Sequence, residues 1–207
     1  MNRAELKAAA KNQINGKIGI LFAISVIIAA ISYVANLISS KIPVGLAVSI
    51  IITPAFALSV VRIYLNVVAG NTPVIKDAFS GFDDFWSAFK VNFFVGLFTF
   101  LWSLLFVIPG IIRSISYSMS LYVLAENKGK PALECIKESM EMTYGHKMEL
   151  FVLSLSFIGW VLLCVLTFGI AYIWVGPYMQ ATFTNAYNCL KPAAPANEDN
   201  EGAIVVE

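Results

Sequence analysis

Long apolar runs alternate with polar, amphipathic stretches along this chain, and the pattern predicts an all-α integral membrane protein. A helix rising about 1.5 Å per residue needs about 20 apolar residues to cross a hydrocarbon core of about 30 Å. Six runs have this length or come close to it, and short turns join them in pairs, so we expect three helical hairpins. The predicted spans are Ile18–Ile38, Val44–Val68, Val91–Ile108, Ile111–Glu126, Glu149–Leu166 and Ile170–Leu190.

The central hairpin, residues 97–127, is the most sharply patterned part of the chain. Two apolar segments meet at Pro109-Gly110, a pair that favours a turn. The returning segment, Ile111–Glu126, would be only about 24 Å long as a helix. A re-entrant hairpin that does not cross the bilayer is therefore the alternative to a full fourth span.

Amphipathic stretches precede the hairpins and predict helices that lie in the membrane interface. Residues Arg3–Asn15 carry basic side chains every fourth position, while residues 71–90 and 127–147 place apolar residues every third or fourth position. For residues 71–90, whose apolar face is aromatic, packing of that face on the helical bundle is the alternative.

A threefold internal repeat is suggested by these units of amphipathic lead, span, turn and returning span. The leads end alike in Gly16-Lys17-Ile18, Phe89-Lys90-Val91 and His146-Lys147-Met148. The segment that follows Trp102 also resembles the one that follows Trp160. Residues 1–190 are thus expected to form one membrane domain, and the acidic residues 191–207 a disordered cytoplasmic tail.

The composition excludes an ordinary soluble domain. Hydrophobic residues make up 58% of the chain and charged residues 13%, about half of what soluble proteins carry. We therefore expect the lipid bilayer as a partner, together with a second copy or another membrane protein, and no nucleic acid. Three cysteines without paired spacing predict buried or interfacial thiols and no disulfide framework, and are Cys135, Cys164 and Cys189.

The basic residues predict the orientation of the chain in the cell membrane. With six spans, both termini and both long loops share one side, which then holds eleven of the lysines and arginines. The other side holds only Lys41 and Arg113. Because cytoplasmic loops carry the excess of positive charge, we expect both termini to be cytoplasmic.

Candidate site residues are the few polar groups inside the apolar runs. Arg62 is expected to reach lipid phosphates, or else to make a contact inside the bundle. Arg113 is expected to reach the outer headgroups, or else to cap a cavity. Asn185 is expected to hydrogen-bond between helices. The chain contains no HExxH, GxSxG or Walker motif, so we expect no catalytic residue, metal site or cofactor.

Several segments together resemble a known family. They are FSGF at 79–82, FLWSLLFVIPGII at 100–112, SYSMSLYVLAEN at 116–127, GHKMELFVLSLSFIGWVLLCVLTFGI at 145–170 and PYMQATFTNAY at 177–187. With the opening MNRAELKAAAK they resemble domain of unknown function 975, a bacterial family of integral membrane proteins. The resemblance implies a protein with several membrane spans, and it implies no site residue.

Three classes of function remain at this point. The sequence favours a non-enzymatic membrane scaffold, sensor or bilayer-interacting protein, because its amphipathic stretches lie beside the spans. A small oligomeric transporter or channel is the alternative. An intramembrane enzyme is the least favoured class, because no nucleophile stands beside a base.

Overall fold

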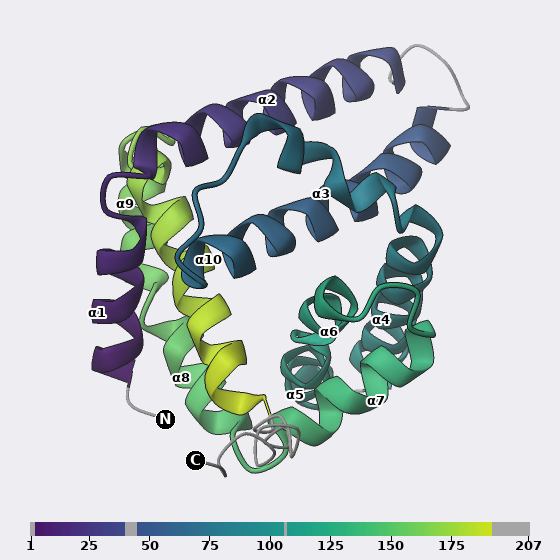
Figure 1. Ribbon diagram of the computed structural model, residues 1–207. Helices are drawn as coiled ribbons and strands as arrows, with labels where there is room; N and C mark the ends of the chain where they lie inside the picture. Colours follow the sequence, from purple (N-terminus) through teal and green to yellow (C-terminus); the bar gives the residue numbers. More distant parts are fainter. Residues whose placement is uncertain (1–2, 40–44, 106, 192–207) are drawn as a thin grey trace, which may run out of the picture.

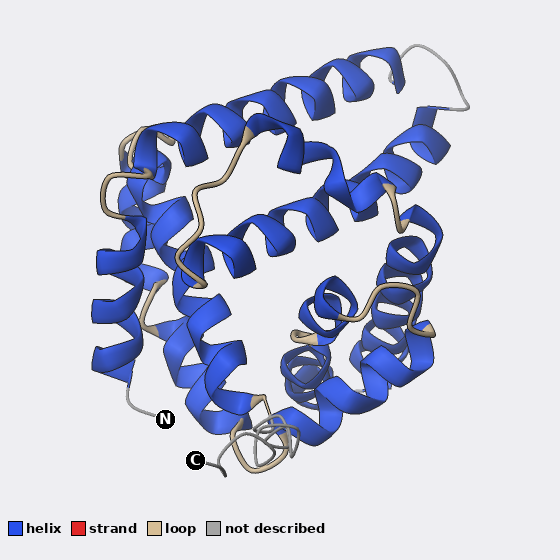
Figure 2. Cartoon of the chain, viewed as in Figure 1, coloured by secondary structure: helices blue, strands red, loops and turns tan. Residues whose placement is uncertain are grey.

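The computed structural model describes residues 3–39, 45–105 and 107–191, and every regular element within them is a helix (Figure 1 and Figure 2). This confirms the all-α prediction. The predicted disordered tail, residues 191–207, lies outside the described residues from position 192 onward. The elements are α1 (Arg3–Ile14), α2 (Ile18–Ser39), α3 (Gly45–Val68), η1 (Ile75–Phe82), α4 (Phe85–Leu105), α5 (Val107–Tyr117), α6 (Ser120–Glu126), α7 (Ala132–Thr143), α8 (Lys147–Leu155), α9 (Ile158–Leu166) and α10 (Tyr172–Leu190).

Three of the predicted spans correspond to single helices, namely α2, α3 and α10. Helix α3 continues through Pro54 and α10 through Pro177, so both prolines lie inside helices. The tight turn predicted before α10 is also confirmed. There Phe168 and Gly169 have φ angles of 51° and 88°, and the hydroxyl of Thr167 accepts the N–H of Ala171 at 3.1 Å.

The third predicted span begins earlier than expected. Helix α4 starts at Phe85 and runs without a break through Lys90 into the apolar run. By contrast, α2 begins directly after Lys17, and α8 begins at Lys147. The ends of the three leads therefore resemble one another in sequence, but the helix that follows begins at a different position relative to the shared lysine.

Helix α4 ends at Leu105 and α5 begins at Val107, so the Pro109-Gly110 pair, where the turn was predicted, lies inside α5. Pro109 instead occupies the first turn of α5, where a missing N–H removes no helical hydrogen bond. Gly110 packs closely on α4, because a Cβ atom there would lie 2.9 Å from the Cα of Ser103. Glycine is needed here for the close approach of the two helices.

The fourth and fifth predicted spans are each divided into two helices. The first division separates α5 from α6 within a serine-rich segment, where Ser118 donates to the carbonyl of Ile115 at 2.8 Å. The second separates α8 from α9, where Ser156 donates to the carbonyl of Leu153 at 2.5 Å. Serine hydroxyls that bond to nearby carbonyls compete with the helical pattern, which explains both breaks.

Two helical stretches among the described residues are long and apolar enough to cross a membrane: Phe85–Leu104 and Lys147–Leu166. The number of candidate spans rises to three if α1 and Ile18–Val34, which meet at an angle of 88°, are counted as one bent span. The described apolar part of α3, Ile52–Val68, is shorter. The six predicted spans are thus all helical, but two or three of them meet the length and composition of a span.

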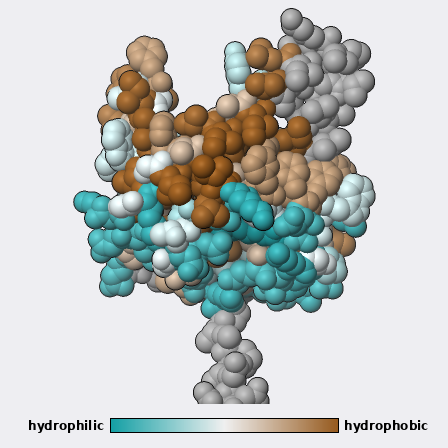
Figure 3. All heavy atoms as spheres, turned by 45° about the horizontal axis from the view of Figure 1, so that its top comes forward, coloured by the Kyte–Doolittle hydropathy of each residue, from teal (hydrophilic) through white to brown (hydrophobic). Residues whose placement is uncertain are grey.

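Apolar and polar surfaces separate on the outside of the molecule (Figure 3). Figure 3 shows an apolar upper part and a polar band beneath it. Side chains at the hairpin ends are among the most exposed apolar groups, with Leu104 76% exposed, Leu166 77% and Phe168 99%. A soluble monomer would not leave so continuous an apolar surface in water.

Two groups of buried side chains hold the helices together. The larger joins α3, α4, α6, α7, α8 and α10 and includes Leu58, Val91, Val123 and Tyr187. The smaller joins α1, α2, α3 and α10 through residues such as Ala10, Leu21 and Ala181. Helix α1 packs along α10 and α7 along α4, so two of the three predicted interface helices are attached to the bundle.

Candidate functional site

The segment η1 and the residues that follow it lie across α3 and are bound to it by three polar contacts. Arg62 of α3 donates to the carbonyl of Ser80 and forms an ion pair with Asp84. The N–H of Gly81 donates to the hydroxyl of Ser59 at 2.8 Å. We call this set of residues the α3–η1 contact. It gives Arg62 the contact inside the protein that was the alternative to lipid phosphates.

Residues 71–90 were predicted to be one amphipathic helix, and the structure divides them into the 3₁₀-helix η1 and the beginning of α4. The aromatic face of this stretch packs on α3, since the ring of Phe56 lies 6.3 Å from that of Phe79 and 5.3 Å from that of Phe82. Phe79 remains 46% exposed. The alternative of packing on the bundle therefore describes the segment better than a free interface helix.

A polar cavity of about 480 Å³ opens beside the α3–η1 contact. Its volume falls within the range of small-molecule sites, about 300–1,000 Å³. Four parts of the chain form its walls: α3, η1, the end of α6 with the following loop, and α10. The polar lining residues are Arg62, Asn66, Asp77, Ser80, Glu126, Lys128 and Asn188.

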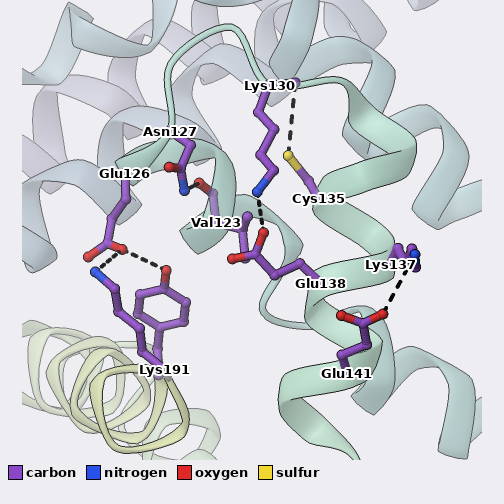
Figure 4. Close-up of polar contacts among 10 residues, drawn as sticks. Val123, Glu126, Asn127, Lys130, Cys135, Lys137, Glu138, Glu141 and Lys191 are labelled. Carbon is purple, nitrogen blue, oxygen red and sulfur yellow. Dashed lines mark hydrogen bonds and ion pairs between the residues drawn. The ribbon is translucent and has the colours of Figure 1, made fainter. Parts of the chain in front are cut away.

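The charges around this cavity are partly neutralised within the protein. Glu126 accepts hydrogen bonds from the hydroxyl of Tyr187 at 2.9 Å and from the ammonium of Lys191 at 2.5 Å (Figure 4). Arg62 is neutralised by Asp84. Lys128 makes no ion pair within residues 3–39, 45–105 and 107–191, so its ammonium is the cation left for a ligand.

The loop that carries Lys128 is fixed to α7. Lys130 forms an ion pair with Glu138, and this hydrogen bond raises the pKa of the Lys130 ammonium (Figure 4). The thiol of Cys135 points back to the carbonyl of Lys130, with the sulfur 3.9 Å from the oxygen. Loop and helix are therefore held together on the polar side of the cavity.

We expect Cys135 to be much less reactive than Cys189. Burial raises the pKa of the Cys135 thiol from 9.0 to about 11, which lowers its thiolate fraction near neutral pH about 100-fold, whereas Cys189 is exposed. Mass spectrometry of peptides after brief alkylation at pH 7.5 should find Cys189 modified and Cys135 free. Equal labelling of the two would contradict the buried position.

The same shift makes stability depend on pH. The folded state raises the thiol pKa above its unfolded value, so the stability that protonated Cys135 contributes is fully present below pH 9. It should decline as pH rises toward about 11. A Cys135→Ala variant should lose this part of the decline in thermal unfolding measured between these pH values.

Arg113 lies elsewhere, between α4 and α7. Its guanidinium stacks on the ring of Trp102, 4.6 Å from the centroid, and donates to the sulfur of Met140 at 3.7 Å. The sequence placed Arg113 and Met140 on opposite sides of the membrane. In the structure the two side chains are in contact, because α7 packs beside α5.

Asn185 occupies a third location, on α10 where α1 packs against it. Its amide donates to the side chain of Gln13 at 2.8 Å and toward the carbonyl of Leu6 at 3.5 Å. This confirms the predicted hydrogen bond between helices. The three predicted site residues thus contact different elements, and only Arg62 lines the polar cavity.

Sequence reasoning did not place the acidic and basic residues Asp77, Glu126 and Lys128 together in a cavity wall. All three lie outside the apolar cores of the predicted spans, where polar residues are expected for solubility alone. The pair Asp83-Asp84 could have indicated the partner of Arg62, because a carboxylate close to α3 could neutralise its guanidinium. Among the residues that the structure describes, no group of three or more His, Cys, Asp and Glu side chains could hold a metal ion.

These observations define a class of protein: among the described residues it is all-helical, with two or three helices that could cross a membrane. It also has a cavity with polar lining residues between α3, η1, α6 and α10. The sequence matches the family described as "Protein of unknown function (DUF975)" over residues 1–116 and 104–194. The chain therefore belongs to this family, as the sequence segments suggested. No curated protein matches the chain, and no solved structure matches it.

Proposed function

We propose that this protein is an integral membrane protein that crosses the cell membrane several times and acts by binding, as a scaffold or sensor, without catalysing a reaction. The observation that carries the proposal is the separation of its surface into an apolar part and a polar band (Figure 3), together with the large apolar side chains exposed at the hairpin ends. Exposing a large apolar side chain to water costs about 1.5–3 kcal/mol. Lipid, or another membrane protein, is the natural environment for this surface.

The proposed topology has six spans in three hairpins, with both termini in the cytoplasm. Its support is the order of the helices and the excess of basic residues in the termini and long loops. Helices α3, α5, α6 and α10, which do not meet the length and composition of a span by themselves, would cross as parts of the packed bundle, where neighbouring helices satisfy their polar groups.

Reporter fusions test this topology. A reporter active only outside the cytoplasm should be active after Lys41 and inactive after Lys130, because the first position follows one span and the second follows four. A cytoplasm-active reporter at the same positions serves as the matched control and should give the opposite pattern. Activity of the external reporter after Lys130 would contradict the six-span arrangement.

The polar cavity supports the binding role. It joins α3, η1, α6 and α10, so a molecule bound there would contact all three hairpins at once.

Partner capture tests the role: membranes crosslinked and purified through the wild-type chain should yield a defined set of partners. Lys128→Glu should reduce that set, whereas Lys137→Glu, which changes the charge of an exposed α7 side chain 74% open to solvent, should not. An identical set from both variants would count against the cavity as the contact site.

A transporter or channel is the second candidate, and the position of Gln180 favours it. This side chain lines a cavity of about 350 Å³ between α2, α3 and α10, and a second one of about 420 Å³ that α6 also lines. A polar side chain among apolar walls could form part of a pathway. Purified protein in liposomes should then give solute flux that Gln180→Leu reduces, while vesicles that stay tight under all conditions would remove this candidate.

A further inference from the structure

A second cavity, of about 390 Å³, lies where α1 meets α9 and α10. It combines two kinds of wall. The polar wall is formed by α1 and its following turn, and the aromatic wall by α9 and α10. The residues that matter here are Lys11, Asn12, Asn15, Trp160, Trp174 and Tyr178.

The cavity exists because α1 is fixed against α10. Ala10 and Ile14 of α1 are buried, and Gln13 accepts the hydrogen bond from Asn185. At Gly16, with a φ angle of 78°, the chain then turns sharply into α2, and the two helices meet at 88°. Helix α1 therefore follows α10 and leaves a groove beside α9.

The aromatic wall of the groove faces an apolar surface that the protein does not cover. Trp160 is 45% exposed and Trp174 is 58% exposed, and Tyr178 holds Trp160 edge-on with centroids 6.3 Å apart. No side chain of α9 is buried. Tryptophan and tyrosine at such a boundary are typical of the level of lipid headgroups.

The polar wall is positively charged. Lys11 makes no ion pair within the described part of the chain, and Asn12 and Asn15 beside it provide amide groups. Lys7, one turn earlier on the same helix, lies 4.5 Å from the ring centre of Phe157. The charge of this wall is complementary to an anion, and its aromatic neighbour is complementary to hydrocarbon.

We propose that this groove binds one phospholipid with an anionic headgroup. The headgroup lies at Lys11, Asn12 and Asn15, the glycerol region lies against Trp160 and Trp174, and an acyl chain continues along the uncovered surface of α9. The proposal rests on the membrane location proposed above, because it assumes that α9 lies in the bilayer, and it does not depend on the six-span topology.

Tryptophan fluorescence tests the proposal. Trp86 and Trp102 are replaced by phenylalanine, so that Trp160 and Trp174 are the two remaining reporters of the four tryptophans. The protein is placed in phosphatidylcholine nanodiscs that contain brominated phosphatidylglycerol or brominated phosphatidylcholine. We expect brominated phosphatidylglycerol to reach a given quenching of tryptophan fluorescence at a mole fraction about fivefold lower than brominated phosphatidylcholine does. One lysine near an anionic lipid strengthens its binding by about this factor.

Matched variants locate the effect. Lys11→Gln should abolish the preference for phosphatidylglycerol, whereas Lys137→Gln, which removes the same charge on α7, should leave it unchanged. Equal quenching by both lipids in the parent protein, or an unchanged preference in Lys11→Gln, would overturn the lipid site while leaving the membrane location intact. Quenching by neither lipid would overturn both. Relief of quenching by soluble glycerol 1-phosphate would show a site for the free anion and would overturn the lipid assignment.

Discussion

Replacing Arg62 by methionine should lower the stability of the protein by about 3 kcal/mol. The guanidinium is 9% exposed and pairs with Asp84, which is 16% exposed. Removing the cation leaves a largely buried carboxylate without a partner, and the carbonyl of Ser80 loses its donor. Thermal unfolding in detergent should show a Tm about 6–12 °C lower than that of the wild type.

A double-mutant cycle separates the ion pair from general loss of packing. Arg62→Met combined with Asp84→Leu should recover most of the lost stability, because no charge then remains buried. The control is Lys137→Ala, since Lys137 and Glu141 form an exposed pair at 3.9 Å that contributes less than about 0.5 kcal/mol. A double variant as unstable as the sum of the single ones would contradict the proposed role of the pair.

Replacing Gly81 by alanine should detach η1 from α3. A Cβ atom at this position would collide with the carbonyl oxygen of Ala55 and would lie 2.8 Å from the backbone nitrogen of Ser59. Both obstacles are backbone atoms of a helix, so the segment must move, and the hydrogen bond from Gly81 to Ser59 is lost. We expect a loss of about 2–3 kcal/mol, together with faster tryptic cleavage at Lys76.

Gly96 provides the matched control for this substitution. It lies inside α4, and a Cβ atom there would have no neighbour within 4 Å. Because alanine is preferred over glycine in a helix interior by about 1 kcal/mol, Gly96→Ala should be neutral or slightly stabilising and should not change cleavage at Lys76. If Gly81→Ala behaved like Gly96→Ala, the close approach of η1 to α3 would be wrong.

The helices that the sequence predicts best are those in which apolar length alone decides the structure. Helices α2, α3 and α10 follow the predicted runs because a long, predominantly apolar run indicates both the type and the extent of a helix. The turn at Thr167–Gly169 was predictable for a similar reason, since Gly169 ends an apolar run and its φ of 88° favours glycine.

The misplaced boundaries have local physical causes that hydropathy does not detect. Serine hydroxyls divide the predicted fourth and fifth spans by bonding to nearby carbonyls. A Pro-Gly pair favours a turn, but proline is equally suited to the first turn of a helix, and Pro109 lies in the first turn of α5. The 3₁₀-helix η1 depends on tertiary contact, because Gly81 must approach the backbone of α3.

The candidate site was predictable only in part, since polarity within a span identifies a residue but not its partner. Arg62 was singled out because it interrupts an apolar run, yet its partner Asp84 belongs to a different element. The other walls of the polar cavity come from η1, α6 and α10, which meet only in the folded chain. Asn185 was the exception, because a bond between helices is the common role of such a side chain.

The pairing of Arg62 with Asp84 also has a consequence for biosynthesis. The cation is synthesised first, and its partner emerges 22 residues later. In the proposed topology, α3 carries during this interval a charge that disfavours its release from the insertion channel into lipid. We therefore expect the first hairpin to wait at the channel until η1 and the beginning of α4 have been made, so that the first and second hairpins enter the bilayer as one unit.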